Sequence, residues 1–226
     1  MEYLVENKTN INKENKYGRT PLFNACERGN KDLVEYLIEH GANINKYSSL
    51  GKTPLFDACE SGIKDLVEYL VENGADINKE NKNGDTILNY VYIFQENDSI
   101  EILVEILVEI LVEHGADVNR ENEFGNTPLI LAICNKNKYL LEYLVENGAD
   151  INQENKNGET PLFKAIELGA KDFVEILVEH GADINKKNKY GETSLFKALQ
   201  SGKKDLVEYL EELGAYIYKE DENGKS

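Results

Sequence analysis

The sequence predicts an all-α solenoid of stacked helical hairpins, because one segment pattern returns at a fixed interval. A 33-residue unit occurs five times and a 41-residue version stands third in the series, so that the units cover 12–44, 45–77, 78–118, 119–151, 152–184 and 185–217. A period of about 20–50 residues is typical of repeat proteins, whose units bury apolar surface only against their neighbours. We expect one domain over 1–226, with partial units at 1–11 and 218–226.

Each unit carries the signals for two short helices and a long turn. In the first unit, the Thr-Pro pair at 20–21 supplies a capping residue and a proline at the first helical position. A turn at 28–30 leads to a second helix over 31–40, in which apolar residues recur at the spacing of one buried face. Gly41 ends this helix as a C-terminal cap. An Asn- and Gly-rich segment, which we call a turn finger (12–19 and its equivalents), precedes each Thr.

These motifs resemble ankyrin repeats over 12–217. Four units contain Thr-Pro-Leu, and Gly-Ala-Asp-Ile-Asn or a close variant follows the second helix. The resemblance implies a concave face of turn fingers and first helices that binds partner proteins without catalysis, and a convex back of second helices. One departure is that the family's usual His after Thr-Pro-Leu is replaced, by Phe23, Phe56, Asn89, Ile130, Phe163 and Phe196. We expect the polar bracing that this His provides between turns to be absent, with ring packing in its place.

The amino-acid composition excludes some classes of binding partner and indicates the type of cellular compartment. The formal net charge of −17 opposes binding to nucleic acid or to an anionic membrane surface. Three cysteines, an odd number, do not suggest a disulfide framework and fit a reducing compartment. Because no signal peptide is visible at the N-terminus, we expect a cytoplasmic protein.

The third unit is longer by eight residues because Ile-Leu-Val-Glu occurs three times in a row, at 102–113. A Glu at every fourth position opposes a membrane span, and the apolar seam is too short for a coiled coil. The pattern therefore predicts an elongated helical hairpin. Its second helix should run from near Ser99 to His114, and its first helix from Thr86 through Phe94 or Gln95.

This extension should leave apolar residues with no obvious neighbour to cover them, at Ile100, Ile102, Leu103 and Val104. One interpretation is a tolerated duplication of a short repeat with local burial. The other is an exposed apolar patch used for self-association or partner docking. We expect a monomer, with self-association through this patch as the alternative.

No motif for catalysis or for a cofactor appears in the sequence. His40, His114 and His180 share one register at the ends of second helices in alternate units, which places them too far apart for a shared metal. Cys26 and Cys59 are expected to be buried, whereas Cys134 lies one position later and is the one thiol that merits a test of reactivity. We therefore expect no enzyme, no metal and no cofactor.

The binding surface predicted from the resemblance consists of finger and first-helix residues. Three of the six turn fingers carry a charge of +2, one is neutral and two carry −1, so together they carry +4 in a chain of −17. Aromatic side chains stand among these charges as anchors. The predicted partner-binding residues are Lys16, Tyr17, Arg19, Arg28, Leu50, Lys52, Phe94, Phe124, Leu168 and Tyr190.

The first two units suit an acidic, partly extended protein or peptide as the partner. Two other interpretations stay open. The chain could be a targeting fragment of a larger enzyme or effector, or a structural element that self-associates through the Ile-Leu-Val-Glu extension.

Overall fold

The computed structural model describes residues 10–94 and 98–217, and for 93–94 and 98–102 it describes the backbone alone. The described residues form helices and turns without a strand, which confirms the predicted all-α class. The chain divides into two compact units, Met1–Asp117 and Val118–Ser226, which we call unit 1 and unit 2. The partial repeats predicted at 1–11 and 218–226 fall almost wholly outside the described residues.

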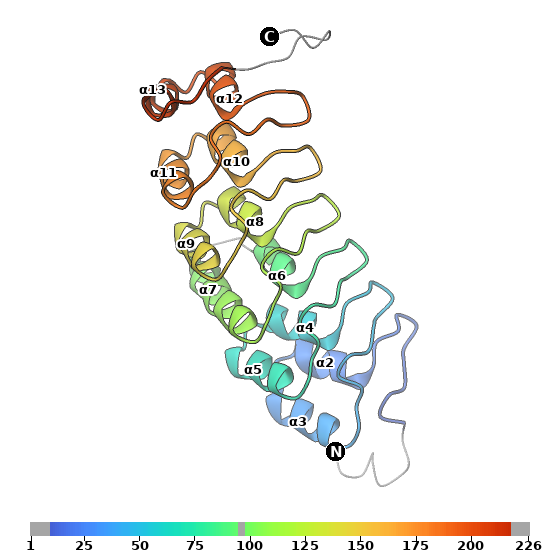
Figure 1. The fold of residues 1–226 in the computed structure, drawn as a ribbon. Helices are drawn as coiled ribbons and strands as arrows, with labels where there is room; N and C mark the ends of the chain where they lie inside the picture. Colours follow the sequence, from blue (N-terminus) through green and yellow to red (C-terminus); the bar gives the residue numbers. More distant parts are fainter. Residues whose placement is uncertain (1–9, 95–97, 218–226) are drawn as a thin grey trace. The chain divides into compact units, whose positions relative to one another are not determined.

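The described residues of unit 1 form three helical hairpins (Figure 1). Their helices are α2 (Pro21–Glu27) with α3 (Lys31–Glu39), α4 (Pro54–Ser61) with α5 (Lys64–Glu72), and α6 (Ile87–Tyr90) with the 3₁₀ helix η1 (Val91–Phe94) and α7 (Asp98–Glu113). Helix α2 packs against its hairpin partner α3 and also against α4 of the next hairpin. First helices therefore stack on first helices, and the turn fingers project from their N-terminal ends.

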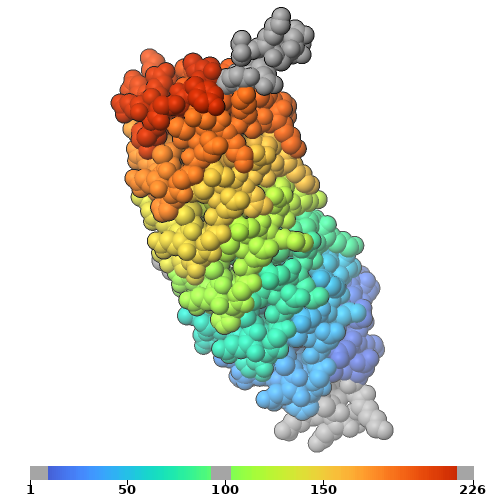
Figure 2. Space-filling view, viewed as in Figure 1, coloured from blue at the N-terminus to red at the C-terminus, as the bar shows by residue number. Residues whose placement is uncertain are grey.

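Unit 2 repeats this arrangement. Its helices are α8 (Pro128–Cys134), α9 (Lys138–Glu146), α10 (Pro161–Leu168), α11 (Lys171–Glu179), α12 (Ser194–Gln200) and α13 (Lys204–Glu212). The first helices α8, α10 and α12 pack in sequence order, and α9 packs against α11. Within each unit, the space-filling view shows successive repeats as adjoining bands (Figure 2).

The core consists of the apolar positions that the sequence period predicts. Leu22 and Leu55 on first helices and Val34 and Leu66 on second helices are buried, and unit 2 repeats the pattern. Proline occupies the start of α2, α4, α8 and α10, as predicted. The threonine cap is less uniform, because the Oγ1 of Thr127 accepts a hydrogen bond from the backbone N–H of Ile130, whereas the side chain of Thr20 makes no such bond.

Polar bracing between the start and the end of each repeat comes from an asparagine at the start of the turn finger, a position that the sequence pattern did not single out. Asn12 Nδ2 donates to the carbonyl oxygen of Gly41 at 2.9 Å, and the backbone N–H of Asn43 donates to Asn12 Oδ1 at 2.8 Å. The same pair of bonds recurs at Asn45, Asn78, Asn119 and Asn152. The expected ring packing is also present between Phe56 and Tyr90, whose ring centroids lie 5.1 Å apart.

Helix α7 has 16 residues, whereas α3 and α5 have 9 each. Its bounds agree with the prediction of a helix from near Ser99 to His114. The first helix of this hairpin is helical to Phe94, as expected, but its last four residues are 3₁₀ and not α. No helix among residues 10–94 and 98–217 is long and apolar enough to cross a membrane.

The expectation that the extension of α7 leaves four residues uncovered is wrong for Val104. This side chain is 1% exposed, because η1 and α5 pack against α7. Leu103 is half-buried and lies over Gly62, where a Cβ atom would come within 2.7 Å of Leu103 Cδ2. The side chains of Ile100 and Ile102 lie outside the described residues.

Candidate functional site

The first turn finger holds Tyr17 at an exposed tip. Asn15 Oδ1 accepts hydrogen bonds from the backbone N–H groups of Tyr17 at 2.9 Å and Arg19 at 3.1 Å, which closes a tight turn on itself. Gly18 has φ of +69°, in the left-handed region that favours glycine. The Tyr17 side chain is 54% exposed as a result of its position at this turn.

The second turn finger is joined to the first through its backbone. The N–H of Ser49 donates to the carbonyl oxygen of Tyr17 at 2.8 Å. The next residue, Leu50, is 63% exposed. Because the two fingers are bonded side by side, they present Tyr17 and Leu50 together.

A pocket of about 340 Å³ opens between these two fingers and the first turns of α4. It is lined by Tyr17, Arg19, Ser48, Ser49, Leu50, Lys52, Asp57 and Glu60. Four of these, Tyr17, Arg19, Leu50 and Lys52, are residues that the sequence predicts to bind a partner. The fold of unit 1 therefore brings part of the predicted set into one concave site.

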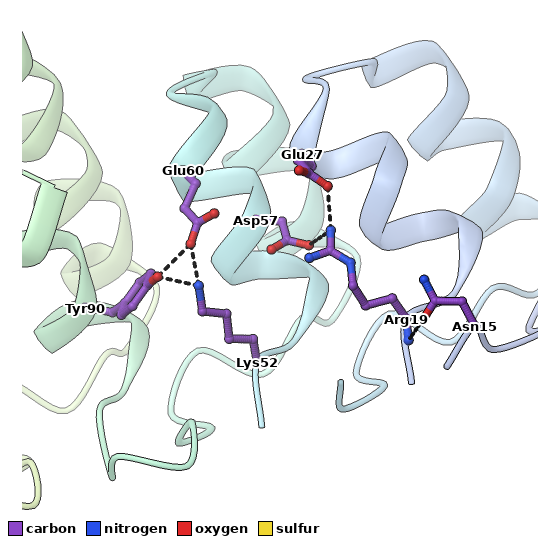
Figure 3. Close-up of polar contacts among 7 residues, drawn as sticks. All are labelled: Asn15, Arg19, Glu27, Lys52, Asp57, Glu60 and Tyr90. Atoms are coloured by element: carbon purple, nitrogen blue, oxygen red, sulfur yellow. Dashed lines mark hydrogen bonds and ion pairs between the residues drawn. The ribbon is translucent and has the colours of Figure 1, made fainter. Parts of the chain in front are cut away.

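Arg19 lies over the floor of this pocket and faces two carboxylates (Figure 3). Its Nη2 donates to Glu27 Oε2 at 2.7 Å and lies 2.9 Å from Asp57 Oδ2. The guanidinium carbon also lies 5.4 Å from the centroid of the Phe23 ring. Arg19 is therefore held by α2 of its own hairpin and by α4 of the next.

Lys52 makes the equivalent contacts one repeat later. Its Nζ lies 2.6 Å from Glu60 Oε1 and contacts the hydroxyl of Tyr90, which donates to the same carboxylate oxygen at 2.7 Å (Figure 3). Its Nζ also lies 4.4 Å from the centroid of the Tyr90 ring. Burial is the largest single effect on the pKa of Lys52 and by itself would lower it. The hydrogen bond and ion pair with Glu60 act in the opposite direction, and the pKa is raised overall.

Asp57 is a buried carboxylate, 1% exposed, on the first turn of α4. Burial raises the pKa of Asp57 to about 7, and the neighbouring Arg19 opposes this rise. Asp57 Oδ2 lies 2.9 Å from Arg19 Nη2, so this buried carboxylate is ion-paired across two repeats. The wall of the pocket thus holds a buried ion pair between the first finger and α4.

The two cations expected to make a basic groove edge, Arg19 and Lys52, are both engaged by carboxylates. Lys16 and Arg28 are exposed. Lys16 Nζ lies 4.8 Å from the centroid of the Tyr17 ring, but Lys16 does not line the pocket.

The other predicted binding residues do not line this pocket. Phe124 and Tyr190 are exposed on turn fingers of unit 2, and Leu168 is half-buried at the end of α10. The side chain of Phe94 lies outside the described residues. Sequence reasoning did not single out Asp57 or Tyr90, although both stand four residues after the unit's Thr, where a first helix faces the finger.

The histidines and cysteines occupy structural positions. The Nδ1 atoms of His40, His114 and His180 lie 2.7, 2.7 and 2.8 Å from a carbonyl oxygen of the preceding helical turn. Among the described residues, no group of His, Cys, Asp and Glu side chains has the arrangement of a metal site. Cys134 is exposed, but desolvation raises its pKa, so its thiolate population at neutral pH is lower than that of an ordinary cysteine.

Stacked helical hairpins with projecting fingers define a repeat scaffold, a class in which a continuous surface of successive repeats binds partners. The family model of ankyrin repeats, in three copies, matches residues 1–81, 79–155 and 140–221. The chain therefore belongs to the ankyrin repeat family, whose members are generally non-catalytic protein–protein interaction modules.

A solved structure supports the same assignment. The chain is similar to the ankyrin repeat domain of Bcl-3, described as a unique member of the IkappaB protein family. The two share 27% sequence identity with a TM-score of 0.79, and the match covers 93% of each chain. No curated protein matches the sequence.

Proposed function

We propose that the protein is a non-catalytic scaffold that binds a partner protein or peptide through its turn fingers and first helices. The observation that carries this proposal is the pocket of unit 1, where exposed Tyr17 and Leu50 flank a polar floor. Large exposed apolar side chains around a concave site are typical of interface anchors, because their burial on binding contributes most of the affinity.

The partner is expected to lie across the finger tips as an extended segment. Ser49 links the first finger to the second, and the N–H of Lys82 donates to the carbonyl oxygen of Leu50 at 3.1 Å, which links the second to the third. The finger tips of unit 1 therefore form a row whose backbones are held together by hydrogen bonds. A rigid row lowers the entropy cost of binding, which favours recognition of a segment by several successive fingers.

An acidic partner, as the sequence predicts, would have to rely on exposed cations outside the pocket. Lys16 and Arg28 are exposed, whereas Arg19 and Lys52 already contact Glu27, Asp57 and Glu60. The self-association alternative through α7 is weakened because Val104 is buried. The three free cysteines support a reducing compartment, and we propose a cytoplasmic location.

The test is affinity capture from a lysate of the source cells with three matched baits. They are the wild type, a finger variant with Tyr17→Ser and Leu50→Ser, and a control with Tyr139→Ser and Leu213→Ser, an exposed residue of α9 and the exposed residue that follows α13 in unit 2. The proposal expects a protein that is retained by the wild type and the control and lost from the finger variant. A set of captured proteins identical for all three baits would contradict it.

A further inference from the structure

We propose that the pocket between the first two turn fingers receives an uncharged aromatic side chain of the partner protein. This inference rests on the proposed function, since it names the chemistry that the finger surface recognises. The acidic groups that the sequence predicts for the partner would then lie outside the pocket, against exposed cations such as Lys16 and Arg28. The charges of the lining, the hydrogen bonds of its main chain and its open apolar surface support the inference.

The charged side chains that line the pocket neutralise one another. Arg19 Nη2 lies 2.9 Å from Asp57 Oδ2, and Lys52 Nζ lies 2.6 Å from Glu60 Oε1. With all four ionised, two cations and two carboxylates give the lining a formal charge of zero. An incoming carboxylate or ammonium group would lose its hydration and would compete with a partner that is already in place. The pocket therefore favours a side chain without charge.

The main chain of the two fingers offers few free groups to a ligand. The N–H groups of Tyr17 and Arg19 donate to Asn15 Oδ1, at 2.9 and 3.1 Å. The N–H of Ser49 donates to the carbonyl oxygen of Tyr17 at 2.8 Å, and the carbonyl oxygen of Leu50 accepts from the third finger at 3.1 Å. Pairing of a partner strand with a main-chain edge needs such groups to be free. Recognition in this pocket therefore depends on a side chain.

The surface that stays open in the lining is apolar. The side chains of Tyr17 and Leu50 are 54% and 63% exposed, and both line the pocket. A cavity of about 150 Å³ can hold a benzene ring. The pocket of about 340 Å³ therefore has room for one ring and for the atoms that join it to a peptide. Its size and its open surface suit one large apolar side chain.

The paired cations of the lining favour a ring over an aliphatic side chain. The guanidinium carbon of Arg19 lies 5.4 Å from the centroid of the Phe23 ring, and Lys52 Nζ lies 4.4 Å from that of Tyr90. Both cations thus combine an ion pair with a ring contact within the chain. A cation–π contact uses the face of the ring and leaves the ion pairs in place. Tyr17 supplies a further ring for an edge-to-face contact.

The direct test is an NMR titration of the ¹⁵N-labelled full chain with N-acetyl-phenylalanine amide. The comparison ligands are the corresponding amides of alanine, leucine, arginine and glutamate. We expect phenylalanine to shift the amide signals of Tyr17, Ser49 and Leu50 and to bind about tenfold more tightly than alanine, because its ring is removed from water. Absence of phenylalanine binding, or equally tight binding of arginine or glutamate, would overturn the inference. Equally tight binding of leucine would overturn the preference for a ring.

A set of variants assigns the effect to the pocket. Tyr17→Ser and Leu50→Ser should each weaken phenylalanine binding about fivefold, whereas Tyr139→Ser on α9 should leave it unchanged. All three side chains are more than two-fifths exposed, so the variants should keep the wild-type urea midpoint. Unchanged binding in both finger variants would exclude this pocket as the site.

Ionic strength adds a readout that a charged ligand would not share. Salt screens the attraction between a charged ligand and the protein, and an uncharged ring has no such attraction to lose. The affinity for phenylalanine amide should therefore change by less than about twofold between about 50 and 500 mM sodium chloride. A marked loss of affinity over this range would count against the proposal.

These experiments fail separately from the test of the proposed function. If lysate capture identifies a partner that depends on Tyr17 and Leu50 while phenylalanine amide does not bind the pocket, the scaffold function holds and the aromatic subsite is wrong. If no captured protein depends on the fingers while phenylalanine amide still binds between them, the subsite holds and the scaffold proposal must be revised.

Discussion

Two repeats of unit 1 and two repeats of unit 2 share one fold but place their charges in opposite order. In the first two repeats of unit 1, the residue before the Thr is a cation, at Arg19 and Lys52, and the first helix that faces it carries acids such as Asp57 and Glu60. In the last two repeats of unit 2 the residue before the Thr is an acid, at Glu159 and Glu192, and the facing helices carry Lys164 and Lys197. The two other repeats, with Asp85 and Asn126 before the Thr, follow neither order.

This inversion changes what each finger does with its charge. In unit 1 the finger cation reaches a first helix, and Arg19 contacts α2 and α4 together. In unit 2 the finger acid is held within its own finger, where Asn155 Nδ2 donates to Glu159 Oε2 at 3.0 Å. Lys164 pairs along its own helix with Glu167 at 2.7 Å. The same backbone thus joins the charged finger residue to the first helices in the first two repeats, and keeps it within the finger at Glu159 of unit 2 and at Asp85 of unit 1, which accepts from Asn81 Nδ2 at 3.1 Å.

The largest effect is expected when the cation before the Thr in unit 1 is replaced by the acid found there in unit 2. Arg19→Glu places a third carboxylate beside Glu27 and buried Asp57, and we expect it to lower the free energy of unfolding by about 3 kcal/mol in urea denaturation at pH 8. In the double variant with Asp57→Asn the loss should be smaller by at least about 1 kcal/mol than the sum of the single changes. Additive effects would mean that Arg19 and Asp57 do not interact.

The asparagine bracing should be stronger in unit 1 than at the end of unit 2. Asn45 makes two bonds to the end of its own repeat, to the carbonyl of Gly74 and from the N–H of Asp76, whereas Asn185 accepts a bond from the N–H of Tyr216. We expect Asn45→Ala to cost about 2 kcal/mol and Asn185→Ala about 1 kcal/mol of unfolding free energy. Equal costs would show that the second bond contributes nothing.

Acid titration should distinguish the two units by the sign of its effect. Burial raises the pKa of Asp57 above its unfolded value, so the folded state binds the proton more tightly and stability falls as pH rises from about 4 to 7. This contribution is at most about 1.4 kcal/mol per pH unit. The Lys164 hydrogen bond lowers the pKa of Glu167, so its stabilisation is present above the ordinary glutamate pKa and lost as pH falls.

Unfolding measured from pH 4 to 8 for Asp57→Asn and Glu167→Gln tests both signs. Relative to the wild type, Asp57→Asn should gain stability as pH rises, whereas Glu167→Gln should lose it in the acidic part of the range. The same sign in both variants would contradict the difference between the units.

A pair of glycines provides the smallest expected difference. Gly62 and Gly202 end first helices in units 1 and 2, with φ of +70° and +67°. Alanine at either position suffers the strain of a left-handed conformation, about 1 kcal/mol. At Gly62 the new Cβ would also meet Leu103 Cδ2 at 2.7 Å, whereas nothing lies within 4 Å at Gly202. We expect Gly62→Ala to cost about 1 kcal/mol more than Gly202→Ala in urea denaturation.

Most of the fold could be predicted from the sequence because the repeat period shows where each helical hairpin begins and ends. Repeated Thr, Gly and apolar positions located the hairpins, and the exposed finger tips at Tyr17 and Leu50 followed from their place in the turn. The form of η1 did not follow from the pattern. A 3₁₀ helix rises about 2.0 Å per residue against 1.5 Å in an α-helix, so a few added residues cover more of the lengthened α7 than an α-helix would.

The charges of the candidate site could not be predicted in the same way. A count of Lys, Arg, Asp and Glu in each finger indicated a basic edge, but the partners of Arg19 and Lys52 lie on helices and in adjacent repeats. That Arg19 Nη2 contacts both Glu27 and Asp57 depends on side-chain geometry that no residue count contains. Asp57 could not be singled out from the sequence, because an acidic residue in a short helix is usually exposed and only the structure shows that this one is buried.

The asparagine bracing has a consequence for how the chain folds. Each of its bonds joins residues 29 or 31 apart in an ordinary repeat, and 37 or 39 apart in the repeat that contains α7. Because loop-closure entropy grows only with the logarithm of length, closing the longer segment costs about 0.2 kcal/mol more. An insertion of two tetrapeptides therefore adds little to the barrier for joining the two ends of this repeat, and the low contact order that allows fast folding of helical proteins is kept within unit 1.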